Sequence, residues 1–197
     1  MRALSSLLAL GLIALPSAAL AHTGHGDAAG ILHGFMHPVG GLDHVLAMVA
    51  VGIFAVVLGG RALWLVPLSF VGMMVLGFGL GANGVTLPYA EPAIALSSIV
   101  IGGVAALGRR MPVVAAMALV GGFAIFHGWA HGAEMPASAG ALDYALGFVA
   151  ATALLHAAGV AAAMGAATIT ARFGRPIART AGALFALGGI GILAGWL

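Results

Sequence analysis

Apolar runs of about twenty residues recur along the whole chain, and they restrict its fold more than any other feature. Of the 197 residues, 62% are hydrophobic and only 6% are charged. Such a run spans the hydrocarbon core of a bilayer when it is helical, and a helix satisfies its own backbone hydrogen bonds there. The sequence therefore predicts an all-α, polytopic integral membrane protein rather than a soluble domain.

The first 21 residues have the pattern of a secretory signal peptide. Arg2 precedes a short apolar core, Pro16 interrupts that core, and residues 19–21 are the Ala-Leu-Ala of a cleavage site. The apolar run is short for a membrane span, which favours cleavage. The alternative is that residues 1–21 are kept as a first membrane helix.

Cleavage leaves residues 22–30 as a periplasmic leader that carries two imidazoles. A free amine beside an imidazole, with a second imidazole nearby, can bind a divalent metal weakly. His22 and His25 are therefore auxiliary metal candidates. The alternative is that the leader is only a flexible hydrophilic segment.

Residues 31–197 are expected to form one membrane domain of six helices after removal of the signal peptide. Pro38, Gly40 and Gly41 lie in the outer part of the first span, and irregular backbone is tolerated there where it lines a cavity or is buried in protein. This predicts a broken or late-starting first helix, regular over about 42–58. Glycines are abundant, and some lie four residues apart, at 77 and 81, 128 and 132, and 191 and 195; this composition predicts tight helix packing overall and no particular contact. The expected spans are 31–60, 62–81, 91–108, 112–131, 141–167 and 180–197.

Arginines set the expected orientation of these spans. Six of them follow the first, third and fifth spans, at positions 61, 109, 110, 172, 175 and 179. Because positively charged loops stay in the cytoplasm, both ends of the mature chain are expected outside, as a cleaved signal peptide also requires. The sequence thus favours a bacterial inner membrane, with both mature termini in the periplasm.

The first polar cluster lies where the first apolar run begins. His37, Asp43 and His44 fall within eight positions, and ionisable groups at membrane depth are functional candidates because they are costly there. The alternative is that both imidazoles are interfacial residues that face water. Asp43 is expected to be harder to replace than His44, which points about 100° round the helix from it and could orient a ligand instead of binding metal.

The second polar cluster lies at the outer end of the fourth span. His127 and His131 are four residues apart and share a helix face, and Glu134 follows three residues later. Two imidazoles and a carboxylate with this spacing can converge on one cation. Such ligands suit Ni, Co, Zn or Fe(II) better than Cu(I), and the absence of Cys excludes thiolate ligands.

Three other residues each have two interpretations. Glu91 opens the third span from outside and is either a metal ligand or a carboxylate stabilised by the helix dipole. Met48, one turn below His44, is expected to pack in the core rather than add a soft ligand. His156 lies in the inner half of the fifth span and is either a packing residue or a station on an ion path.

The two polar clusters resemble the signatures of the HupE/UreJ family, which are small permeases linked to nickel or cobalt supply. The first signature is His37-x5-Asp43-His44, and the second is Phe126-His-Gly-Trp-Ala-His-Gly-Ala-Glu134. The resemblance covers nearly the whole chain, because the signal peptide, the His-bearing leader, the six spans and both motifs occur in order. The second motif is long and specific, whereas the first is shorter but falls in the expected place.

The resemblance implies a transporter and not an enzyme. It implies that Ni²⁺ or Co²⁺ is the transported substrate, with no prosthetic group, and that the metal supplies hydrogenase or urease maturation. Accessory proteins of those enzymes and a second copy of the chain are candidate partners. The positions that the resemblance implies as critical or functional are His37, Asp43, Phe70, Glu91, His131 and Glu134.

Uptake is expected to be secondary or channel-like, because the chain has no G-x-x-x-x-G-K-[ST] motif of an ATPase. Its net charge of +2 is too small to suggest nucleic acid as a partner. The alternative function is an intramembrane zinc-dependent hydrolase, with Glu134 or Asp43 as the general base. A third is a metal sensor or chaperone subunit for a partner permease, which binds metal without passing it.

Overall fold

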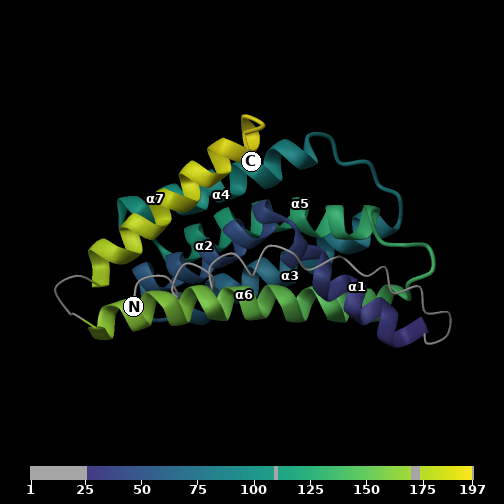
Figure 1. The fold of residues 1–197 in the computed structure, drawn as a ribbon, viewed down its shortest axis with the longest axis horizontal. Helices are drawn as coiled ribbons and strands as arrows, with labels where there is room; N and C mark the ends of the chain where they lie inside the picture. Colours follow the sequence, from purple (N-terminus) through teal and green to yellow (C-terminus); the bar gives the residue numbers. More distant parts are fainter. Residues whose placement is uncertain (1–25, 109–110, 170–173, 197) are drawn as a thin grey trace, which may run out of the picture.

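The computed structural model describes residues 26–108, 111–169 and 174–196, and all regular secondary structure in this part of the chain is helical (Figure 1). The expected signal peptide and the leader imidazoles His22 and His25 lie outside the described residues. The prediction of an all-α protein is confirmed. The helices of the described ranges are α1 (Gly26–Gly40), α2 (Leu42–Leu58), α3 (Ala62–Ala82), α4 (Ala90–Leu107), α5 (Val113–Ala133), α6 (Ala141–Ile169) and α7 (Gly174–Leu193).

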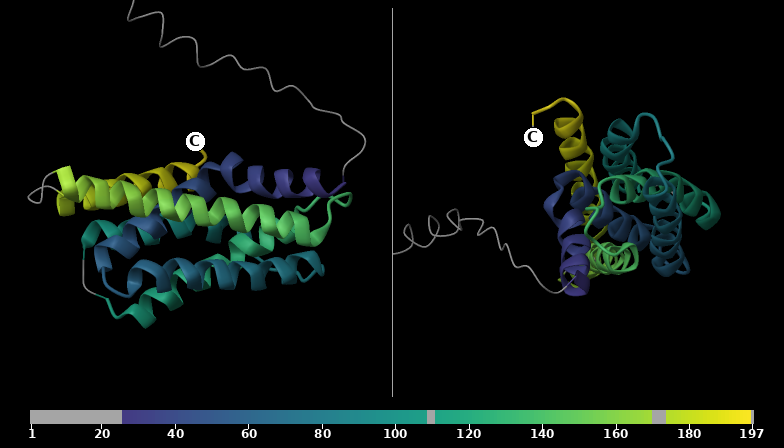
Figure 2. Two further views of the ribbon diagram at one scale, coloured as in Figure 1. Left: turned by 90° about the horizontal axis from the view of Figure 1, so that it is seen from below. Right: turned by 90° about the vertical axis from the view of Figure 1, so that its right-hand side faces the viewer.

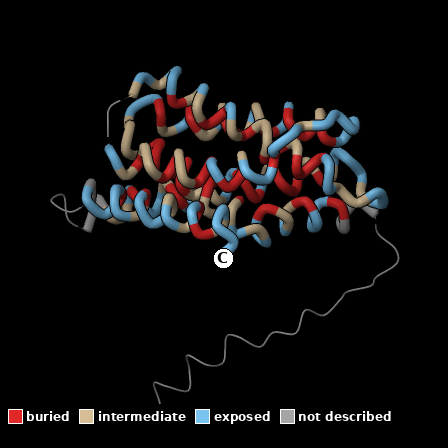
Figure 3. Tube along the Cα trace, turned by 90° about the horizontal axis from the view of Figure 1, so that it is seen from above, coloured by how far each residue is buried: buried red, intermediate tan, exposed pale blue. Residues whose placement is uncertain are grey.

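Five of these helices, α3 to α7, are long and apolar enough to cross a membrane. The pair α1–α2 adds a sixth candidate when it is taken as one broken span. Large apolar side chains such as Trp64, Leu68, Leu76 and Leu154 are exposed on the outside of the bundle. Buried residues gather between the helices instead (Figure 3). The prediction of a polytopic helical membrane protein is confirmed.

The first span is broken at Gly41, where α1 and α2 meet at 82°. Gly41 has extended backbone, and its carbonyl oxygen accepts the N–H of Val45 at 3.0 Å, which starts α2. Pro38 lies in the last turn of α1, where its missing N–H weakens the helix. The predicted break and the regular helix predicted over 42–58 are therefore confirmed. The structure adds a helix before the break, which begins at Gly26 and takes in the end of the expected leader.

The last helix differs from the expected range of 180–197, because α7 spans Gly174–Leu193. It can start early because Pro176 lies in its first turn, where a backbone N–H has no partner within the helix. It ends before Gly195, whose φ of 71° is left-handed and is favoured by glycine. Arg175 and Arg179, expected in the loop before the sixth span, therefore lie within α7.

The long helix α6 is the element against which the broken first span packs. Figure 2 shows α1 lying beside the first part of α6. A Cβ on Gly34 of α1 would overlap the backbone oxygen of Tyr144, and a Cβ on Gly52 of α2 would overlap that of His156. The two helices of the broken span therefore lie one after the other along α6.

The helices α3 and α5 touch through their backbones. Gly77 and Gly81 of α3 face α5, and Gly128 and Gly132 of α5 face α3. A Cβ at any of these positions would overlap the facing backbone at Ile125, Trp129, Met74 or Phe78, respectively. The tight packing predicted overall is seen at this contact, whereas Gly195 lies beyond the end of α7 and an added Cβ there would meet nothing within 4 Å. This contact holds the imidazole-bearing end of α5 firmly against α3.

Candidate metal centre

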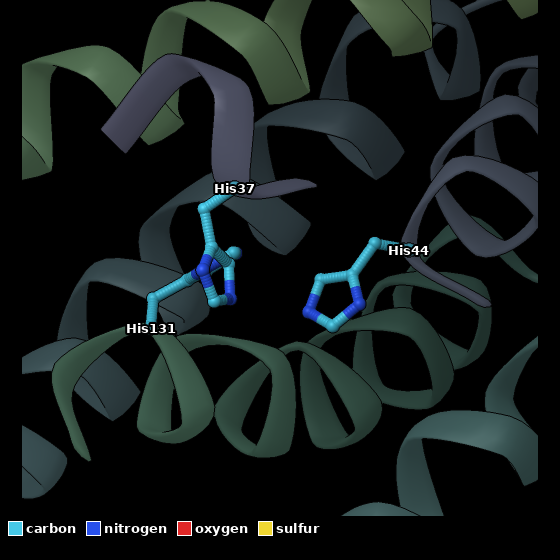
Figure 4. A group of neighbouring side chains, drawn as sticks. All are labelled: His37, His44 and His131. Atoms are coloured by element: carbon cyan, nitrogen blue, oxygen red, sulfur yellow. The ribbon is translucent and has the colours of Figure 1, made fainter. Parts of the chain in front are cut away.

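Three imidazoles from separate helices converge where the first span is broken. His37 ends α1, His44 begins α2 and His131 lies near the end of α5, and one ring nitrogen of each lies within 4.8 Å of the others. Figure 4 shows the three rings turned toward a shared space. Three nitrogens that each bind one ion at about 2.1 Å are themselves about 3.4 Å apart. A small closing movement of the rings is therefore enough to hold a first-row transition metal.

The imidazoles of this group have unpaired nitrogens in a buried setting. His131 is 0% exposed and His44 is 7% exposed. Among the described residues, neither ring nitrogen of His131 has a hydrogen-bond partner, and neither does Nε2 of His44. Buried polar atoms without a partner are rare because they are costly. A bound cation would satisfy these lone pairs, so the arrangement suits a metal ligand set.

Asp43 fixes the orientation of the neighbouring imidazole. Its Oδ1 accepts the backbone N–H of His44 at 2.8 Å and lies 3.0 Å from Nδ1 of the same residue. An ionised carboxylate only accepts hydrogen bonds, so Nδ1 of His44 carries the proton and Nε2 keeps its lone pair. Carboxylates commonly orient metal-binding imidazoles in this way. The geometry gives Asp43 a positioning role and puts His44 among the candidate ligands.

Glu134 lies on the solvent-exposed side of the three-imidazole group. Its Oε2 is 3.4 Å from Nε2 of His37, and its side chain is 52% exposed. It follows the last residue of α5, so that it extends the helix face that carries His131. A carboxylate beside the imidazoles would lower the electrostatic energy of a nearby dication.

His127 adds a fourth imidazole one turn below His131 on α5. Its ring centroid lies 4.8 Å from that of His44, and its Nε2 lies 2.9 Å from Oγ of Ser97. The Ser97 hydroxyl donates its one proton to the carbonyl oxygen of Ile94 at 2.6 Å. Nε2 of His127 must then donate to Ser97, which leaves Nδ1 with a free lone pair and no partner in the described chain.

The other candidate residues lie away from the three-imidazole group. Glu91 is exposed in the first turn of α4, and no contact among the described residues joins it to the three imidazoles. Phe70 is fully buried on α3, and its ring centroid lies 5.5 Å from that of His127 and 5.1 Å from that of His156. The leader residues His22 and His25 fall outside the described residues.

Ser97 is a site residue that the sequence argument does not identify. It lies beside Ser98 in the middle of an otherwise apolar span, and a polar residue at that depth is itself a signal of function. The sequence does not show which of the two hydroxyls faces an imidazole. That choice depends on how α4 is rotated against α5.

Comparison with known proteins identifies the family of this chain. The sequence model of the family described as HupE / UreJ protein matches residues 9–192. Protein HupE of Rhizobium leguminosarum bv. viciae is 45% identical over 190 residues, which cover 94% of this chain and 95% of that protein. No solved structure matches the chain. A match of this extent shows that the chain belongs to the HupE / UreJ family.

Proposed function

We propose that this protein takes up a divalent transition metal across the inner membrane of a bacterium, Ni²⁺ first and Co²⁺ second. The observation that carries the proposal is the convergence of His37, His44 and His131 within 4.8 Å, beside the carboxylate of Glu134. Imidazole suits nickel, cobalt and zinc, whereas magnesium and calcium prefer oxygen ligands. Membership of a family associated with nickel and cobalt uptake for hydrogenase or urease supports the same substrate.

The outer face is the side from which the ion would enter. Arg61 follows α2, and Nε of Arg179 donates to the carbonyl oxygen of Ala106 near the end of α4. The positive-inside rule assigns these ends to the cytoplasm, whereas the imidazoles lie at the start of α2 and the end of α5. This orientation, with a cleaved signal peptide, puts both mature termini in the periplasm. An inside-negative potential then favours entry by about 4.6 kcal/mol for a dication at 100 mV.

Flux measured in liposomes tests the proposal. The purified full-length protein is reconstituted with an inside-negative potential, and accumulation of Ni²⁺, Co²⁺, Zn²⁺ and Mg²⁺ is followed separately. We expect accumulation of Ni²⁺ and Co²⁺, none of Mg²⁺, and background levels for the variant His131→Ala. No flux of any dication, or wild-type flux by His131→Ala at equal protein density, would overturn the proposal.

The same experiment separates transport from zinc-dependent hydrolysis. Three imidazoles with an open position are also a ligand set of catalytic zinc. A hydrolase keeps its ion through many turnovers, and a sensor subunit binds metal without moving it. Metal that stays bound at a fixed stoichiometry, with no accumulation in the lumen, would favour one of these two alternatives.

A further inference from the structure

A second group of metal-binding side chains lies deeper in the bundle. Met48 of α2, Met74 of α3 and Thr152 of α6 are all fully buried. The hydroxyl of Thr152 lies 3.4 Å from the sulfur of Met48 and 3.6 Å from the sulfur of Met74. Two thioethers from different helices therefore point at one hydroxyl. All three side chains are fully buried, where packing alone would require no polar contact.

His156 belongs to this group because it follows Thr152 by one helical turn on the same face of α6. It is 3% exposed, and neither of its ring nitrogens has a hydrogen-bond partner among the described residues. A neutral imidazole always carries one N–H donor and one acceptor. Burying both without a partner is costly. A bound cation would satisfy the acceptor nitrogen of His156.

We propose that His156, Met48 and Met74 form an inner binding site for a late first-row transition-metal dication. The proposal rests on the proposed function, because the ion would be the same one that the outer imidazoles receive. One imidazole and two thioethers are a borderline-to-soft ligand set, which excludes magnesium and calcium more strongly than the outer group does. The two sulfurs accept the Thr152 hydroxyl, and an ion would take its place on their lone pairs.

Phe70 contacts an imidazole of each group. Its ring centroid lies 5.5 Å from that of His127 and 5.1 Å from that of His156. It also precedes Met74 by one turn on α3, so that it borders the inner site from the same helix. The Phe70 ring therefore borders both groups of side chains.

X-ray absorption at the nickel edge tests the inner site directly. The full-length protein in detergent is loaded with excess Ni²⁺ alone, washed free of unbound metal, and its bound metal is counted. Because the chain has no Cys, sulfur in the nickel coordination shell can come only from methionine. We expect sulfur scattering in the wild type, and its loss together with one metal equivalent per chain in the double variant Met48→Leu/Met74→Leu.

The matched control is Met164→Leu, since Met164 lies on the same helix as His156 but is 49% exposed on its outer face. It should keep both the sulfur signal and the stoichiometry. His156→Leu should also lose one equivalent while the imidazole scattering of the outer site persists. Leucine is close to methionine in volume and such swaps are well tolerated. A wild-type spectrum without sulfur overturns the inner site even if no variant folds.

Flux measured on the same samples distinguishes this proposal from the proposed function. Sulfur-bound nickel in a wild-type protein that moves no metal would refute transport and leave the inner site standing. Transport by the wild type without sulfur in the nickel shell, or undiminished transport by Met48→Leu/Met74→Leu, would refute the inner site and leave transport standing. With both correct, the double variant should transport at least tenfold more slowly than Met164→Leu.

Discussion

The imidazole Nδ1 of His44 lies 3.0 Å from Oδ1 of Asp43, so two adjacent residues in the first turn of α2 act as one unit. Replacing Asp43 by Asn removes the charge that fixes the His44 tautomer and balances a bound dication. Loss of a carboxylate partner of this kind costs about 10–100-fold in metal affinity. We expect Asp43→Asn to lower Ni²⁺ accumulation at low metal to background, with normal protein abundance.

His44→Gln should be less damaging than Asp43→Asn, because the free lone pair of His127 lies beside it. The two ring centroids are 4.8 Å apart, so His127 can serve as the third imidazole. The double variant His44→Gln/His127→Gln should then have no uptake. If Asp43→Asn transports normally while His44→Gln alone has none, His44 is the indispensable ligand and Asp43 is dispensable.

His37 and His33 make a matched pair on α1, one helical turn apart. His37 belongs to the three-imidazole group, whereas His33 is exposed and outside it. We expect His37→Ala to weaken Ni²⁺ binding by at least tenfold and His33→Ala to leave it unchanged. Isothermal titration of the purified variants measures both. Equal effects of the two changes would mean that α1 contributes no specific ligand.

Substitutions of Ser97 and Ser98 test whether the hydrogen bond from His127 to Ser97 matters for uptake. Both serines are fully buried, and each donates to a backbone carbonyl three residues earlier, but Ser97 alone also accepts a hydrogen bond from His127 among the described residues. Ser97→Ala frees the His127 ring to turn and leaves its N–H without a partner, which costs roughly 1–3 kcal/mol. We expect slower Ni²⁺ uptake for Ser97→Ala and wild-type uptake for Ser98→Ala, measured at equal abundance.

Alanine substitutions at Gly128 and Gly122 of α5 distinguish the effect of helix contact on stability from the effect of helix propensity. A Cβ on Gly128 would overlap the backbone oxygen of Met74, while one on Gly122 would meet nothing within 4 Å. Gly128→Ala should therefore destabilise the bundle by about 1–3 kcal/mol, as overpacking does. Gly122→Ala should be neutral or slightly stabilising. Thermal unfolding in detergent decides, and equal midpoints would contradict backbone contact between α3 and α5.

Uptake should fall as the external pH drops through about 6, since free imidazole has a pKa near 6.5. Protons compete with the metal for the ligand nitrogens, so acid weakens binding and neutral pH restores it. Initial rates between about pH 5 and 7.5, at constant membrane potential, measure this. A flat profile would mean that external protons do not reach any imidazole on which the uptake rate depends.

Local features of the sequence predict much of this architecture. Gly41 and Pro38 mark the break, and the range 42–58 coincides with α2. The spacing of His127 and His131 predicts that both face one side of α5. Partners across the bundle are harder to predict, because rotation of each helix depends on contacts such as Gly128 against Met74. The proximity of His44 to His127, and the contact of Phe70 with two imidazoles, follow only from that packing.

Because of the break at Gly41, His37 is held in the three-imidazole group by a different helix contact from His44 and His131. His131 and His44 come from helices packed in the interior, whereas α1 rests on α6 through the contact of Gly34 with Tyr144. In the proposed transporter, docked α1 would hold the His37 ring at a high effective concentration beside the other two imidazoles. Release of α1 from α6 would leave a bound ion two ligands and speed its exchange. The residence time of the metal would then depend on the docking of a single short helix.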